Sequence, residues 1–197
     1  RKYVIDISEA IVEKGDDLES VMQSDIDSSP DDEEMLVELF NKEISRLRCY
    51  FYHSSIVLVY TLLESSLLHL CGEIKKYTNS RLNLQDLSGN NLILKPILYI
   101  DLTCDVDLKK EKKLYDRIYE YQQLRNQIVH QNSRVKGNTT VELNNNAKIF
   151  ERIFPGIQVN KESWDFYITD SRLVEDLIDV VERFLVLSIR KVAALEI

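Results

Sequence analysis

One short stretch of the chain carries residues whose types and spacing suit catalysis: Arg125, Asn126 and His130, near the end of a predicted helix. At about 100° per residue, Asn126 and His130 lie about 40° apart on one helix face, and Arg125 flanks that face. Histidine exchanges protons near neutral pH, and arginine is a permanent cation whose forked donors suit phosphate. These groups predict metal-independent RNA cleavage, in which the ribose 2′-OH attacks the adjacent phosphate. The histidine transfers a proton and the arginine stabilises the phosphoryl oxygens.

One histidine does not easily act as acid and base on opposite sides of the same phosphate. A two-fold homodimer that joins two such helix ends supplies a pair of each group. Arg134 and Lys136 follow the histidine and are the candidate RNA-binding residues. The chemistry needs no cofactor, and we expect no metal site. In the alternative interpretation, His130 only stabilises the negative end of its helix, and Arg125 and Asn126 are solvated.

Several other residues are open to two interpretations. Glu64 lies in an apolar run, where it either pairs with Arg125 and orients the guanidinium or reaches solvent at the rim. The wide spacing of His53 and His69 favours core or surface positions over metal binding. A basic run either guides RNA or forms a solvated face, and three tyrosines either stack bases or pack in the core or in a dimer interface. These residues are Lys109, Lys110, Lys112, Lys113 and Arg117, and Tyr115, Tyr119 and Tyr121.

The charge of the chain is unevenly distributed. The 197 residues carry a net charge of −8, which alone argues against a protein that coats nucleic acid. Residues 1–43 hold fourteen acids and four bases, so the rest of the chain is close to neutral, and residues 109–136 carry +5. The acidity therefore does not exclude an RNA site around Arg125 and His130.

Cysteine usage and hydropathy indicate a cytoplasmic protein without a membrane span. The cysteines Cys49, Cys71 and Cys104 are odd in number and widely spaced, which fits a reducing compartment. No secretion signal is visible at the start of the sequence. The longest apolar stretch, 56–71, is interrupted by Glu64 and His69, so we expect a core helix rather than a membrane helix.

The elements that position the motif are mainly helical. With 5 glycines and 3 prolines the chain lacks the turns of an all-β protein. Apolar spacing predicts an acidic helical segment over 1–28 and then a domain over 29–197. Within that domain we expect helices over 30–72 (as one helix or two, the second half at the centre of the core), 92–102 (or a packed loop), 108–131 and 171–194. Alternation predicts short strands at 139–143, 157–159 and 165–169, a β insert at about 138–169.

The motif Arg125-Asn126-x-x-x-His130 resembles the Arg-x4-His signature of the HEPN superfamily, including the polar residue after the arginine. The apolar helix with a central Glu64 resembles the first core helix of that superfamily. The stretch 84–89 leading into Leu98 and Tyr99 resembles its connector in stand-alone bacterial members. The resemblance covers roughly residues 50–195. It implies a HEPN-like antiparallel helical bundle with a small β-hairpin insert between the motif helix and the C-terminal helix.

Many HEPN proteins are dimeric, metal-independent endoribonucleases of toxin–antitoxin, phage-defence and CRISPR-associated systems, and others are non-catalytic binding modules. The resemblance therefore implies either a ribonuclease toxin or defence effector, with an antitoxin or regulatory protein as a possible partner, or a module that binds RNA, a nucleotide or a protein. Members paired with a nucleotidyltransferase antitoxin often carry a tyrosine two residues after the histidine. Asn132 stands there, which argues against such a partner.

Overall fold

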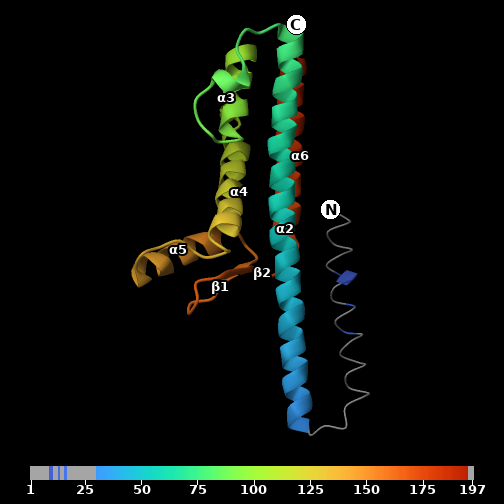
Figure 1. Cartoon of the computed structure of the whole chain (residues 1–197), viewed down its shortest axis with the longest axis vertical. Coiled ribbons are helices and arrows are strands. Elements are labelled where there is room, and N and C mark those ends of the chain that lie inside the picture. Colours follow the sequence, from blue (N-terminus) through green and yellow to red (C-terminus); the bar gives the residue numbers. More distant parts are fainter. Residues whose placement is uncertain (1–8, 11–12, 14–15, 17–29, 195–197) are drawn as a thin grey trace. The chain divides into compact units, whose positions relative to one another are not determined.

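Helices account for most of the residues that the computed structural model describes, which are 9–10, 13, 16 and 30–194. The predicted acidic segment over 1–28 lies outside them, apart from four residues. In chain order the elements are α2 (Pro30–Thr78), α3 (Leu94–Cys104), α4 (Lys112–His130), α5 (Thr140–Ile153), β1 (Ile157–Val159), β2 (Phe166–Ile168) and α6 (Arg172–Ala193) (Figure 1). Short 3₁₀ turns span Leu84–Asp86 and Leu108–Lys110. The predicted class, mainly helical with a small hairpin between the motif helix and the last helix, is confirmed.

The chain divides into two compact units, which we describe separately. Among the described residues, the first unit joins 30–56 with 127–176, and the second joins 57–126 with 177–194. Each unit therefore gathers segments that are far apart in the sequence. The divisions fall inside α2, α4 and α6, so the motif helix contributes Arg125 and Asn126 to the second unit and His130 to the first.

The first unit is built around a short antiparallel hairpin. Val159 pairs with Phe166 and Ile157 with Ile168, and these four side chains are buried, whereas the pair between them, Gln158 and Tyr167, is exposed. The segment after α4 lies alongside the start of β2 and is joined to it by an isolated antiparallel bridge between Arg134 and Asp165. Here the Val135 amide donates to the Trp164 carbonyl at 2.9 Å, and the Phe166 amide donates to the Ser133 carbonyl at 2.8 Å.

Two of the three predicted strands are present, and the strand predicted over 139–143 is wrong. That stretch is the start of α5, where Thr139 caps the helix by accepting a hydrogen bond from the Glu142 amide at 3.2 Å. The buried side chains that follow, Ala147 and Phe150, continue a helical spacing from Leu143. The alternation of five residues was too short to distinguish a strand from a capped first turn.

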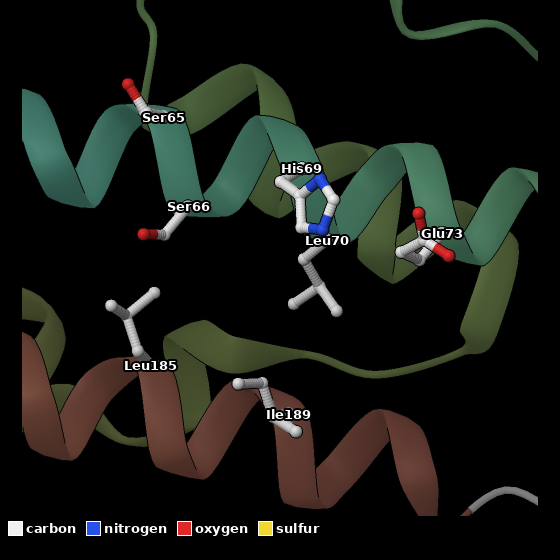
Figure 2. A pocket seen from close by; sticks show the side chains of 7 residues that line it. All are labelled: Ser65, Ser66, His69, Leu70, Glu73, Leu185 and Ile189. Atoms are coloured by element: carbon white, nitrogen blue, oxygen red, sulfur yellow. The ribbon is translucent and has the colours of Figure 1, made fainter.

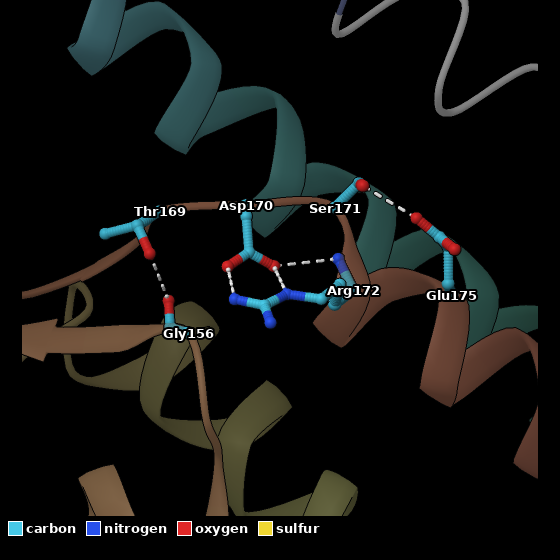
Figure 3. A network of polar contacts seen from close by, with 6 residues as sticks. All are labelled: Gly156, Thr169, Asp170, Ser171, Arg172 and Glu175. Atoms are coloured by element: carbon cyan, nitrogen blue, oxygen red, sulfur yellow. Dashed lines mark hydrogen bonds and ion pairs between the residues drawn. The ribbon is translucent and has the colours of Figure 1, made fainter.

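The start of α6 is fixed by a local polar network (Figure 3). Asp170 accepts hydrogen bonds from the Arg172 amide at 2.9 Å and from two guanidinium nitrogens at 3.0 and 2.7 Å. The Ser171 hydroxyl donates to Glu175 at 2.6 Å. The Thr169 hydroxyl donates to the carbonyl of Gly156, whose φ of +97° places it in the region that favours glycine. The helix predicted over 171–194 is therefore confirmed, and it begins at Arg172 directly after these polar residues.

The second unit packs parts of four helices together. Its core comes from one face of α2 and from inward positions of α3, α4 and α6, and includes Tyr60, Leu63, Leu67, Ile97, Ile100, Tyr121, Leu124, Leu177 and Phe184. Lys191 near the end of α6 forms an ion pair of 2.9 Å with Glu111 just before α4, so these two helices run in opposite directions. Cys71 and Cys104 are buried free thiols, as is Cys49 in the first unit.

Helix α2 is continuous from Pro30 to Thr78, which decides between the one-helix and two-helix predictions. Only one face of its second half is buried, because Leu58 and Leu62 remain 71% and 60% exposed. The expectation that this half lies at the centre of the core is therefore confirmed for the face that carries Tyr60 and Leu63, and wrong for the opposite face. The helix is long and apolar enough over 34–78 to cross a membrane by length and composition, a test that the core helix of a soluble protein also passes.

Candidate functional site

His130 is the last residue of α4, and its side chain is exposed. Among the described residues it forms no hydrogen bond, ion pair or ring contact. An imidazole in this position is accessible to a substrate, and it has the negative end of the helix dipole beside it. The chain ends the helix here through two left-handed residues, Asn132 and Ser133, with φ values of +50° and +60°.

Arg125 and Asn126 contact each other directly in the second unit. The Arg125 Nη1 atom donates a hydrogen bond of 3.1 Å to the Asn126 Oδ1 atom, and both side chains are half-buried. The Arg125 Nε atom is buried without a partner. Asn126 therefore restrains one edge of the guanidinium, while the Nε donor of the fork is turned away from solvent.

Glu64 does not pair with Arg125, which was one of its two predicted roles. Its side chain is 8% exposed, and its carboxylate oxygens are not among the buried side-chain atoms that lack a partner. It forms no hydrogen bond and no ion pair within 4.0 Å with Arg125 or another described residue. Burial raises the pKa of the neighbouring Tyr60 hydroxyl, and the charges of Glu64 and Arg125 act on it in opposite directions. Glu64 and Arg125 therefore both lie near the Tyr60 hydroxyl, but Glu64 does not hold the guanidinium.

The Tyr60 hydroxyl offers a test of this cluster, because it is buried without a hydrogen-bond partner. Replacing Tyr60 with phenylalanine removes an unsatisfied polar group, so we expect the free energy of unfolding to stay the same or to rise by about 1 kcal/mol. Urea unfolding of the two proteins measures this change. A loss of about 1 kcal/mol or more in Tyr60→Phe would mean that the hydroxyl has a stabilising partner.

The loop that follows His130 is tied to α2 through His53, a contact that the sequence analysis missed. The Ser133 hydroxyl lies 3.0 Å from His53 Nδ1, and His53 Nε2 lies 3.5 Å from the Cys49 sulfur. The His53 ring also packs on Phe166, with centroids 5.4 Å apart. His53 and Ser133 are 80 residues apart, so helical spacing carries no signal for this contact. His53 is the buried histidine that one of the two sequence interpretations expected.

Burial lowers the pKa of His53 to about 4, from an ordinary value of about 6.5. The unfolded chain takes up a proton between these values and the folded chain does not, so the free energy of unfolding falls as the pH drops from 6.5 towards 4. We expect this histidine to contribute about 2 kcal/mol to the loss between pH 7 and pH 4.5. Urea unfolding at pH 7 and at about pH 4.5 measures it. His53→Gln, which cannot take up the proton, is expected to lose less stability over the same interval, and equal losses would contradict the assignment.

Arg134 and Lys136 are both exposed on the segment that pairs with β2. Neither side chain has a hydrogen bond or ion pair with another described residue. The lysine run at 109–113 is also exposed, and it belongs to the second unit. Of the three tyrosines considered for stacking, Tyr121 is fully buried and Tyr115 is partly buried, while Tyr119 is 50% exposed. The described residues contain no group of three or more His, Cys, Asp or Glu side chains able to hold a metal ion.

A second surface feature is an apolar groove of about 570 Å³ between α2 and α6 in the second unit. Figure 2 shows its lining of Ser65, Ser66, His69, Leu70, Glu73, Leu185 and Ile189. A smaller pocket that shares Leu70, Glu73 and Ile189 extends the groove to Tyr77. None of the candidate site residues lines it.

No protein-family model matches the chain, no curated protein matches its sequence, and no solved structure matches its fold. The resemblance to HEPN proteins therefore rests on the motif residues and their helical setting.

Proposed function

We propose that the protein is a metal-independent endoribonuclease of the HEPN type, which cleaves RNA by attack of a ribose 2′-OH on the adjacent phosphate. The observation that carries the proposal is the end of α4. There an exposed His130, which has no partner among the described residues, follows an arginine whose guanidinium is restrained by Asn126. His130 transfers the proton, Arg125 stabilises charge on the phosphoryl oxygens, and Asn126 positions Arg125.

The proposed active form is a homodimer, because the reaction needs an acid and a base on opposite sides of the phosphate. His130 of one protomer takes the proton from the 2′-OH, and His130 of the second protonates the leaving 5′-oxygen. The products carry a 2′,3′-cyclic phosphate and a 5′-hydroxyl, and no metal ion or cofactor enters the reaction. We place the protein in the cytoplasm, as a toxin or phage-defence effector whose activity a second protein restrains.

The experiment that tests this function is cleavage of a single-stranded RNA by the wild-type protein in EDTA. We expect cyclic-phosphate ends, and no cleavage at a nucleotide whose 2′-OH is replaced by hydrogen. Cleavage that depends on added Mg²⁺, or that proceeds at the 2′-deoxy position, would contradict the mechanism. Failure to cleave any RNA tested would favour the second candidate.

The second candidate is a non-catalytic HEPN-like interaction module that binds RNA, a nucleotide or a protein. The observation that favours a protein partner is the groove between α2 and α6, where Ile189 is 53% exposed beside Tyr77, which is 73% exposed. Exposed apolar surfaces of this kind mark interaction sites. Chemical cross-linking of the wild-type protein and of Ile189→Asp in cells separates the two candidates, because only the module requires this surface.

A further inference from the structure

The outer surface of the β-hairpin in the first unit brings together four side chains, none of which belongs to the Arg125–His130 motif. We define the hairpin face as Arg134, Gln158, Asp165 and Tyr167. Arg134 lies directly opposite Asp165 in an antiparallel bridge, and Gln158 lies opposite Tyr167 in the β1–β2 register. Asp165 and Tyr167 are two residues apart on one strand, so all four side chains point to the same side of the sheet.

The ring of Tyr167 is available on this face. It is 41% exposed, while its neighbours along the strand, Phe166 and Ile168, are turned into the core. Among the described residues, Tyr167 forms no ring contact and its hydroxyl forms no hydrogen bond. A rigid strand therefore holds an aromatic ring in solvent with its supporting residues buried beneath it.

A cation lies next to that ring. Arg134 is a diagonal neighbour of Tyr167 across the strands, within reach of a long side chain. Although Asp165 faces it, no ion pair within 4.0 Å joins the two among the described residues. The exposed Lys136 lies two residues beyond Arg134, on the same side of the extended segment. The guanidinium is therefore free to bind an anion beside an open aromatic ring.

We infer that the hairpin face is a binding site for single-stranded RNA, in which Tyr167 stacks on an unpaired base and Arg134 binds a neighbouring phosphate. Proteins bind single strands by this combination of an aromatic platform and cations along the backbone. A base within a duplex is already stacked on both sides, so the face selects unpaired nucleotides. The inference rests on the proposed ribonuclease function for its choice of RNA. It places a bound nucleotide close in sequence to His130, four residues before Arg134.

The test measures binding separately from cleavage. All proteins carry His130→Ala to prevent cleavage, and the probe is a fluorescein-labelled oligoadenylate RNA of about 12 nucleotides, titrated by fluorescence anisotropy. We expect Tyr167→Ala to raise the Kd about five- to 150-fold, since stacking supplies that difference per base. Tyr167→Phe keeps the ring and is expected to bind like the parent. The matched control is Tyr50→Ala, which removes a tyrosine of α2 that is 53% exposed, and we expect it to bind like the parent.

Arg134→Ala supplies an independent measurement. We expect it to reduce the slope of log Kobs against log salt by about 1, because it removes one phosphate contact, whereas Tyr167→Ala leaves the slope unchanged. An unchanged Kd in Tyr167→Ala, an equal loss in Tyr167→Phe, or no binding by the parent protein would each overturn the inference. Cleavage by the wild-type protein together with Tyr167-independent binding refutes this site alone. Tyr167-dependent binding without cleavage refutes only the proposed nuclease.

Discussion

Replacing His130 with alanine is expected to slow RNA cleavage in EDTA by about 10²–10⁴-fold, the range that a positioned acid or base contributes. The imidazole is exposed at the end of α4 and has no partner in the part of the chain that the structure describes, so its removal leaves the packing of the helix intact. The loss should therefore appear in kcat with little change in RNA binding. Single-turnover cleavage of a labelled RNA by equal amounts of both folded proteins measures it.

His69→Ala is the matched control for this substitution, because His69 is also an exposed histidine on a helix but lies in the second unit. It should cleave at the wild-type rate.

Mixing the wild-type protein with an excess of His130→Ala tests the homodimer, since subunit exchange then produces sites with one histidine. We expect the wild-type activity to fall as the variant is added. A His130→Ala protein that cleaves as fast as wild type would remove the catalytic proposal, whatever its oligomeric state.

Elements with a long periodic pattern were predicted well from the sequence. The helices α2, α4 and α6 each repeat apolar residues over five turns or more, and their ends carry caps such as Asp170 and Ser171. The strand predicted at 139–143 failed because five residues contain too little periodicity to exclude a capped helical turn. The exposed face of the second half of α2 was not predicted either. This stretch is apolar nearly all round, so its pattern does not indicate which face is buried, and the sequence did not show that Leu58 and Leu62 face outward.

The candidate site was predicted in part. Local spacing identified the residues of α4, because they lie on one helix. Local spacing does not predict contacts between distant segments, such as the Ser133–His53 hydrogen bond or the pairing of Arg134 with Asp165. Glu64 illustrates the same limit. A carboxylate in an apolar run predicts a partner, but whether an arginine reaches it depends on helix packing that no single-sequence pattern encodes.

Replacing Phe166 with alanine is expected to lower the free energy of unfolding by about 3–5 kcal/mol. Its side chain is 1% exposed, and its ring packs against Phe150 and His53 at centroid distances of 4.9 and 5.4 Å. The cavity left by the ring would therefore touch α5, α2 and the hairpin at once. Urea unfolding measures the loss, and a cost below about 1 kcal/mol would mean that this core repacks easily.

Tyr167→Ala is the matched control, because it removes a neighbouring aromatic ring from the same strand on the exposed face. We expect it to change the free energy of unfolding by no more than about 0.5 kcal/mol.

The two substitutions also separate the two faces of β2, the buried face that supports the loop after His130 and the exposed face proposed to bind RNA. The Phe166 amide holds the Ser133 carbonyl at 2.8 Å, and Ser133 contacts His53, so the buried side of the strand fixes the loop that follows His130. Phe166→Ala should accordingly reduce cleavage through a displaced loop. Tyr167→Ala should reduce RNA affinity in a protein whose fold and stability are unchanged.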